Sequence, residues 1–130
     1  MRDLLVTSHF RVVEDEHLRI VTRSRTAQRF ASAEEVVAEY DGLVRSLDHV
    51  DRASYAVLVD LRLAPPRNDE AFEEIVGRYH ARLYERFRRV AVVVLTAAGR
   101  LQLRRFLSVA RSDARVFTDV DEASAFLREQ

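Results

Sequence analysis

The sequence contains no cysteine and no lysine, and it has only three glycines and two prolines. Without cysteine, the chain can form no disulfide, no thiolate nucleophile and no thiolate metal site. All 21 basic residues are arginine, which excludes a Schiff base, a phosphate-loop lysine and a lysine general base. The glycines, Gly42, Gly77 and Gly99, lie too far apart to form a glycine-rich phosphate loop. These absences exclude several common kinds of enzyme site.

Long apolar runs are also absent, because no stretch approaches the roughly 18 residues of a membrane-spanning helix. The opening residues, MRDLLVTSHF, are too polar for a signal peptide. Hydrophobic residues make up 48% of the chain and charged residues 32%, a balance typical of a globular domain. We therefore expect one domain, spanning residues 1–130, in the cytoplasm.

Charge of one sign is scarce in two long segments, although the net charge of the chain is zero. Residues 31–77 hold eleven acids and four arginines, whereas residues 78–111 hold nine arginines and one acid. Such a bipolar molecule could bind a charged partner or form a homodimer, or its patches could simply keep it in solution. A nucleic-acid partner is not expected, because aromatic residues are not interleaved with the arginines.

Hydrophobic periodicity predicts strands in two different patterns. Period-two alternation predicts a hairpin of two strands, about 9–14 and 17–23. Nearly continuous apolar runs predict buried strands at 55–61 and 90–96, and the run ARVF predicts a short last strand at 114–117.

Apolar residues at helical spacing predict four helices, at residues 32–47, 69–88, 99–111 and 119–129. Ser32 and Glu35 form a capping box for the first helix, and Asn68 or Asp69 can cap the second. The order of elements is then β-β-α-β-α-β-α-β-α. Strands separated by helices imply parallel neighbours, while the hairpin adds an antiparallel pair. We therefore predict an α/β fold with a mixed sheet of four or five strands and about four helices.

Three short stretches, VVEDE, VLVDLRLAP and VVVLTAAG, resemble the active-site strands of response-regulator receiver domains. On that resemblance Asp15, Asp60 and Thr96 would be the acidic residue, the phosphoryl acceptor and the switch residue. However, the lysine of that family is absent, and the acidic cluster precedes a β pattern rather than a helix. A degenerate receiver-like module therefore remains only an alternative.

Longer stretches carry a second resemblance: SAEEVVAEYDGLV, YAVLVDLRLAPPRNDEAFEE, VAVVVLTAAGRLQLRRF and VFTDVDEASAFL. Together with the opening hairpin, they resemble the STAS domain, the fold of anti-sigma-factor antagonists, and most closely its SpoIIAA-like offshoot. The resemblance implies a sheet covered largely on one side by helices. It also implies a regulatory, non-enzymatic role, in which the loop after the central strand and the following helix bind a protein partner.

The phosphorylation site of the STAS antagonists is missing from this sequence, because residues 61–95 contain no serine or threonine. Asp69 and Glu70 instead place permanent negative charge at the start of a helix. These acids either mimic a phosphorylated state or simply cap the helix. The resemblance makes Arg67, Asn68, Asp69 and Glu70 candidate partner-binding residues.

Three more candidate partner-binding residues, Arg100, Arg104 and Arg111, fall within about 40° of one another on the predicted helix 99–111. This stripe could bind an anionic protein surface or a lipid headgroup, or it could be a solvated arginine face. Because the SpoIIAA-like fold is similar to that of CRAL-TRIO lipid carriers, lipid binding is a further alternative. That alternative needs a large apolar cavity, which we do not expect 130 residues to enclose beside a packed core.

No pattern of catalytic or metal-binding residues is present. The four histidines, His9, His17, His49 and His80, lack the spacing of metal ligands. There is no Gly-x-Ser-x-Gly nucleophile elbow. We therefore expect no enzyme activity, no cofactor and no metal.

Overall fold

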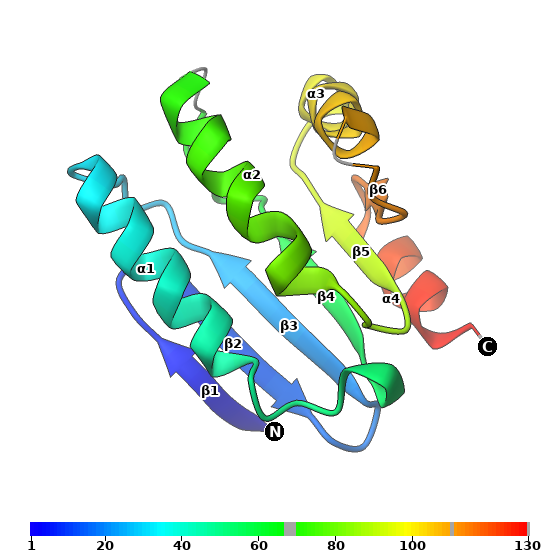
Figure 1. Ribbon diagram of the computed structural model, residues 1–130. Helices are drawn as coiled ribbons and strands as arrows, with labels where there is room; N and C mark the ends of the chain where they lie inside the picture. The colour runs from blue at the N-terminus through cyan, green and yellow to red at the C-terminus, as the bar shows by residue number, and fades with distance from the viewer. Residues whose placement is uncertain (67–69, 110, 130) are drawn as a thin grey trace.

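The computed structural model describes residues 1–66, 70–109 and 111–129, which form a single twisted sheet with helices on both faces (Figure 1). The strands are β1 (Arg2–Val6), β2 (Phe10–Asp15), β3 (Ile20–Arg25), β4 (Ala56–Asp60), β5 (Val90–Val93) and β6 (Arg115–Phe117). The helices are α1 (Ala33–Ser46), α2 (Glu70–Tyr84), α3 (Ala97–Val109) and α4 (Val120–Arg128), with a 3-10 turn, η1 (Arg52–Ser54), before β4. No helix of the described chain is long and apolar enough to cross a membrane.

The strands lie in the sheet in the same order as in the sequence, from β1 to β6. The first three form an antiparallel meander, and β3 to β6 run parallel with a helix in each crossover. The predicted α/β class with a mixed sheet and four helices is confirmed, but the predicted strand count was wrong. The additional strand is β1, an edge strand with a register irregularity between Asp3 and Leu5 that interrupts its period-two pattern.

The hairpin also differs in register from the prediction, because its second strand is Ile20–Arg25 rather than 17–23. The chain turns between β2 and β3, where Asp15 Oδ1 accepts a hydrogen bond from the backbone N–H of Leu18 and Arg19 adopts a left-handed φ of 56°. β3 therefore begins three residues later than predicted and ends two residues later, at Arg25. Arg23 and Arg25 consequently face the interior on the same side of the sheet as Val21.

The two faces of the sheet are covered unequally. Figure 1 shows α1, α2 and α3 on one face, here called the front, and α4 behind β4, β5 and β6. The strand β4 is buried on both faces, with Val57 in the front core and Leu58 in the back core beside Leu127 of α4. Helices therefore cover the sheet largely on one side, as expected.

Local capping fixes the ends of two helices. Ser32 Oγ accepts a hydrogen bond from the N–H of Glu35 at 3.1 Å, and Glu35 Oε1 accepts one from the N–H of Ala31 at 2.7 Å. Asp119 caps α4 by accepting from Asp121 and Glu122. The predicted caps of α2, Asn68 and Asp69, lie outside the described residues.

Candidate functional site

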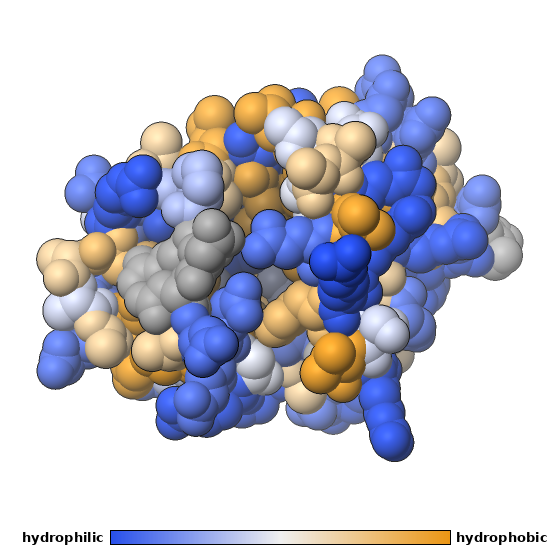
Figure 2. Space-filling view, turned by 90° about the horizontal axis from the view of Figure 1, so that it is seen from above, coloured by the Kyte–Doolittle hydropathy of each residue, from blue (hydrophilic) through white to orange (hydrophobic). Residues whose placement is uncertain are grey.

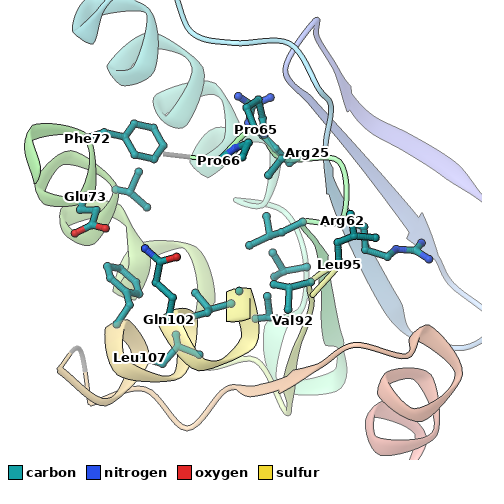
Figure 3. A pocket seen from close by; sticks show the side chains of 18 of the residues that line it. Arg25, Arg62, Pro65, Pro66, Phe72, Glu73, Val92, Leu95, Gln102 and Leu107 are labelled. Carbon is teal, nitrogen blue, oxygen red and sulfur yellow. The ribbon is translucent and has the colours of Figure 1, made fainter. Parts of the chain in front are cut away.

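A cavity of about 710 Å³ lies on the front face of the sheet, between α2 and α3. Figure 3 shows side chains around an open space, with Phe72 and Glu73 on α2, Gln102 on α3, and Val92 and Leu95 on β5 and the segment after it. This volume lies within the range of roughly 300–1,000 Å³ that is typical of small-molecule sites. The space is open to solvent on one side, so it is a cleft and not the enclosed apolar cavity that the lipid-carrier alternative needs.

The cavity exists because α2 and α3 diverge above the sheet. In the described part of the chain, α2 packs along α1 but does not pack along α3. One aromatic contact joins them, the edge of the His80 ring against Phe106 at a centroid distance of 5.8 Å. Six strands give the three front helices a wide sheet to cover, and the space left between the last two becomes the cavity.

The walls of the cavity are mainly apolar. They include valine and leucine side chains on β4 and β5 or directly after them, and aliphatic or aromatic side chains on both helices: Val59, Leu61, Val92, Val94, Phe72, Val76, Leu103 and Phe106. The burial of His80 lowers the pKa of its imidazole, and the nearby charge of Arg23 lowers it further. His80 is therefore a neutral part of the wall at physiological pH.

The cavity opens toward the carboxyl ends of β4 and β5. Its lining there includes exposed residues, among them Leu95, which is 70% exposed. Figure 2, which looks onto the molecule from above, shows a hollow near the middle of the surface, with apolar and charged residues around it. A ligand can therefore enter from solvent without unfolding the domain.

Arg23 is the most unusual residue in the lining, because it is charged and only 4% exposed. Its guanidinium lies over the ring of Phe10 at 4.7 Å, and Nη2 donates to the hydroxyl of Tyr40 at 3.3 Å. Its Nε has no hydrogen-bond partner, and no carboxylate of the described residues lies within 4.0 Å of its side chain. Since arginine stays charged, a buried cation faces the cavity with no carboxylate counter-ion among the described residues.

Arg25 extends the positive end of the cavity. It is 7% exposed, its guanidinium lies against the ring of Phe30 at 4.6 Å, and Nη1 donates to the carbonyl of Thr26 at 2.6 Å. Arg29 and Arg62 also line the cavity, and both are more exposed. The only described acid in the lining is Glu73, so the lining carries a net positive charge.

The three receiver-like residues do not come together. Asp60 ends β4 and forms an ion pair with Arg62 at 2.8 Å, which keeps the pKa of Asp60 below its ordinary value. Asp15 pairs with Ile20 of β3 and Asp60 with Ser24, so the two acids are four residues, or about 13 Å, apart along that strand. The cause is the antiparallel hairpin. It places the carboxyl end of β2 beside the amino ends of β3 and β4, whereas Asp60 lies at the carboxyl end of β4. Thr96 lines the cavity instead.

The predicted partner-binding residues have different outcomes. Arg67, Asn68 and Asp69 lie outside the described residues, and Glu70 is exposed at the start of α2. Arg100 and Arg104 line a common groove beside β6.

The predicted stripe does not include Arg111, because α3 ends at Val109. Arg111 instead has a left-handed φ of 54° and does not line the groove. The helical spacing used to place it on the stripe therefore does not apply.

Sequence reasoning missed Arg23 and Arg25. The sequence did hold an indication of their position. Val21, Arg23 and Arg25 are two residues apart, and residues at this spacing point to the same face of a strand. Within the described chain, no three acidic or histidine side chains are grouped to hold a metal ion.

Comparisons of the chain with protein-family models, with curated proteins and with solved structures find no match. The STAS and SpoIIAA-like resemblance therefore stays a prediction from sequence.

Proposed function

We propose that the protein is a non-enzymatic binding domain whose α2–α3 cavity holds a small organic acid with an apolar body. The observation that supports this most is Arg23, a buried guanidinium without a carboxylate partner in the described chain, facing an apolar cavity of about 710 Å³. The sequence left lipid or anion binding as an alternative function. The proposed ligand combines the two, because it has a carboxylate group and an apolar body.

The energetic basis is the cost of burying a charge, which is several kcal/mol even after the surroundings relax. At Arg23 the hydroxyls of Tyr40 and Tyr84 and the ring of Phe10 offset part of this cost, in place of a carboxylate of the described chain. A ligand carboxylate beside Arg23 would supply the missing counter-ion and an acceptor for its Nε. Guanidinium and carboxylate groups form short, charge-assisted and often bidentate hydrogen bonds. The anionic end of the ligand would therefore lie against β3, near Arg23 and Arg25.

The rest of the ligand would extend between the helices. Burial of apolar ligand surface against Val92, Leu103 and Phe106 would contribute roughly 25 cal/mol for each Å² removed from water. A linear or branched hydrocarbon chain fits these walls better than a sugar or a nucleotide, because few polar groups between the helices could satisfy hydroxyl groups.

The lining also favours binding over catalysis. Its one histidine, His80, lies edge-on to Tyr84 and to Phe106, and no described acid is positioned to orient it as a base. The absence of an oriented nucleophile and base among the described lining residues supports a carrier or sensor role.

A regulatory protein contact, as the STAS resemblance implies, is a second candidate function. One observation favours it: Leu63, in the segment after β4, and Leu95 near the mouth of the cavity are 68% and 70% exposed. Exposed apolar residues that form a contiguous patch can mark a site of protein–protein contact. Replacing Glu70 with alanine together with Asn68 and Asp69 should then reduce partner recovery in a pull-down, and unchanged recovery would remove this loop as the contact.

Ligand binding is best tested with a matched pair of probes, decanoate and decanol, which share a ten-carbon chain and differ in the charged group. We expect decanoate to bind the wild-type protein at least tenfold more tightly by isothermal titration calorimetry. Arg23→Met should abolish this preference, while Arg105→Met, which removes an exposed arginine outside the cavity lining, should preserve it. Equal binding of the two probes, or a preference retained in Arg23→Met, would contradict the proposal.

A further inference from the structure

A second concave site lies on the other side of α3. It is a groove of about 520 Å³ between α3 and β6, the edge strand of the sheet. Figure 1 shows α3 above β6 at this end of the molecule, away from α1. The residues that line the groove are Arg100, Arg104, Leu107, Ser108, Ser112, Ala114, Arg115, Val116 and Phe117.

The charged residues among the described lining of this groove are all arginines. Arg100 and Arg104 are one helical turn apart on α3, and Arg115 comes from β6. No acidic residue lines the groove, and none of the three arginines has a carboxylate within 4.0 Å in the described chain. The guanidinium of Arg115 lies over the ring of Phe126 on α4 at 5.2 Å, so Arg100 and Arg104 supply the charge on the α3 side of the groove. These two like charges repel each other, and an anion between them would stabilise the arrangement.

The hydrogen-bond donors in the groove are incompletely used. The Nε of Arg100 is buried and has no hydrogen-bond partner. Ser112 Oγ accepts from the N–H of Ala114 at 3.2 Å, which leaves its own hydroxyl proton available to donate. Ser108 places a second hydroxyl on the wall formed by α3.

We propose that this groove binds a phosphate monoester. A phosphate dianion presents three terminal oxygens in different directions, which suits the guanidinium groups of Arg100 and Arg104 together with the hydroxyls of Ser108 and Ser112. A carboxylate offers only two oxygens in one plane. The groove is larger than a bare phosphate, and its apolar lining at Leu107 and Val116 would contact the organic part of the ester. This site is separate from the proposed carboxylate site and does not depend on it.

The phosphate could belong to a soluble metabolite or to a phospholipid headgroup, and two binding measurements distinguish these sources. Phenyl phosphate, followed by calorimetry, represents the soluble ester. Vesicles of phosphatidic acid in phosphatidylcholine, compared with phosphatidylcholine alone, represent the headgroup. Binding to phenyl phosphate alone assigns a soluble ligand, and additional binding to the phosphatidic acid vesicles assigns a headgroup.

The chain offers a closely matched control for this test. Arg104 and Arg105 are adjacent exposed arginines on α3, and only Arg104 lines the groove. We expect Arg104→Gln to weaken phenyl phosphate binding at least tenfold, and Arg105→Gln to change it less than twofold. Thermal unfolding of both variants should match the wild type, since both side chains are exposed.

Three results would overturn the phosphate proposal. The first is no binding of either probe by the wild-type protein. The second is an equal loss in Arg104→Gln and Arg105→Gln, which would indicate attraction to the net charge of α3 alone. The third is tighter, Arg104-dependent binding of a glutamate-rich peptide than of phenyl phosphate, which would assign the groove to an acidic protein.

Discussion

The two halves of the front layer contain similar residues but pack very differently. Between α1 and α2 the aromatic rings interlock: Phe10 meets Tyr40 edge-on at 5.2 Å, Tyr40 lies 5.5 Å from Tyr79, and the Tyr79 hydroxyl donates to Asp41 at 2.7 Å. Between α2 and α3 the aliphatic walls stay apart and leave the cavity. The packed half resembles the close-packed interior of proteins, whereas the open half leaves apolar walls that a ligand could cover.

Buried charge shows the same contrast. Glu14, on the packed side, accepts hydrogen bonds from the hydroxyl of Tyr55 and from Arg2, both at 2.6 Å. Arg23, in the cavity, has no such counter-ion within the described residues. A fully satisfied charge is typical of structure, whereas a buried charge that lacks a counter-ion is typical of a site.

The largest expected effect concerns packing on the two sides of α2. Leu43→Ala, at a fully buried position of α1, should lower the free energy of unfolding by about 2–5 kcal/mol, because it opens a new void. Leu103→Ala, in the wall of the existing cavity, should cost about 1 kcal/mol or less, since little packing is lost there. Urea denaturation measures both values. Equal costs would show that the two halves are packed alike.

The next effect concerns the space itself. Val76→Phe places a larger side chain in the cavity and should raise the free energy of unfolding by about 0.5–2 kcal/mol, as cavity-filling substitutions commonly do. The same substitution should abolish decanoate binding. If Val76→Phe destabilised the protein and still bound decanoate, the space between α2 and α3 would not be the binding site.

The smallest effect is the pH dependence of the packed side. The hydrogen bond from Tyr55 is the main cause that lowers the pKa of Glu14, burial opposes it, and Arg2 contributes further. The same contact raises the pKa of Tyr55 to about 12. Because the folded-state pKa of Glu14 is depressed, its contribution to stability is present above about pH 4.5 and is lost as the pH falls below that value.

Tyr55→Phe tests this linkage. The variant should be less stable than the wild type by about 1–2 kcal/mol at pH 7, because the carboxylate loses its main donor. The difference should shrink as the pH falls through the lowered folded-state pKa of Glu14, because the carboxyl group is then protonated in both proteins. Urea denaturation at a series of pH values from 7 downward measures it, and a difference that does not change with pH would remove Glu14 as its source.

Local patterns were sufficient to predict most of the fold. The apolar runs of β4 and β5, the capping box of Ser32 and the helical spacing of α1 depend on neighbours in sequence, and the sequence predicts them correctly. The edge strand β1 was missed because its apolar residues, Leu4 and Leu5, are adjacent and do not alternate.

The candidate site could not be predicted in the same way. A cavity between α2 and α3 depends on how far two helices stand apart on a sheet, which no local pattern encodes. Arg23 and Arg25 face inward because the hairpin turn ends at Arg19 and sets the register of β3. A one-residue shift of that register would have turned both side chains toward the opposite face.

The free energy of unfolding of Arg23→Met, measured with and without decanoate, tests the central claim most directly. Without ligand, the variant should be at least as stable as the wild type, because it removes a buried charge that has no counter-ion in the described chain. At a decanoate concentration 100 times the dissociation constant, the wild type should gain about 2.7 kcal/mol and the variant almost nothing. A variant that is strongly destabilised without ligand, yet gains as much from decanoate as the wild type, would contradict a carboxylate site at Arg23.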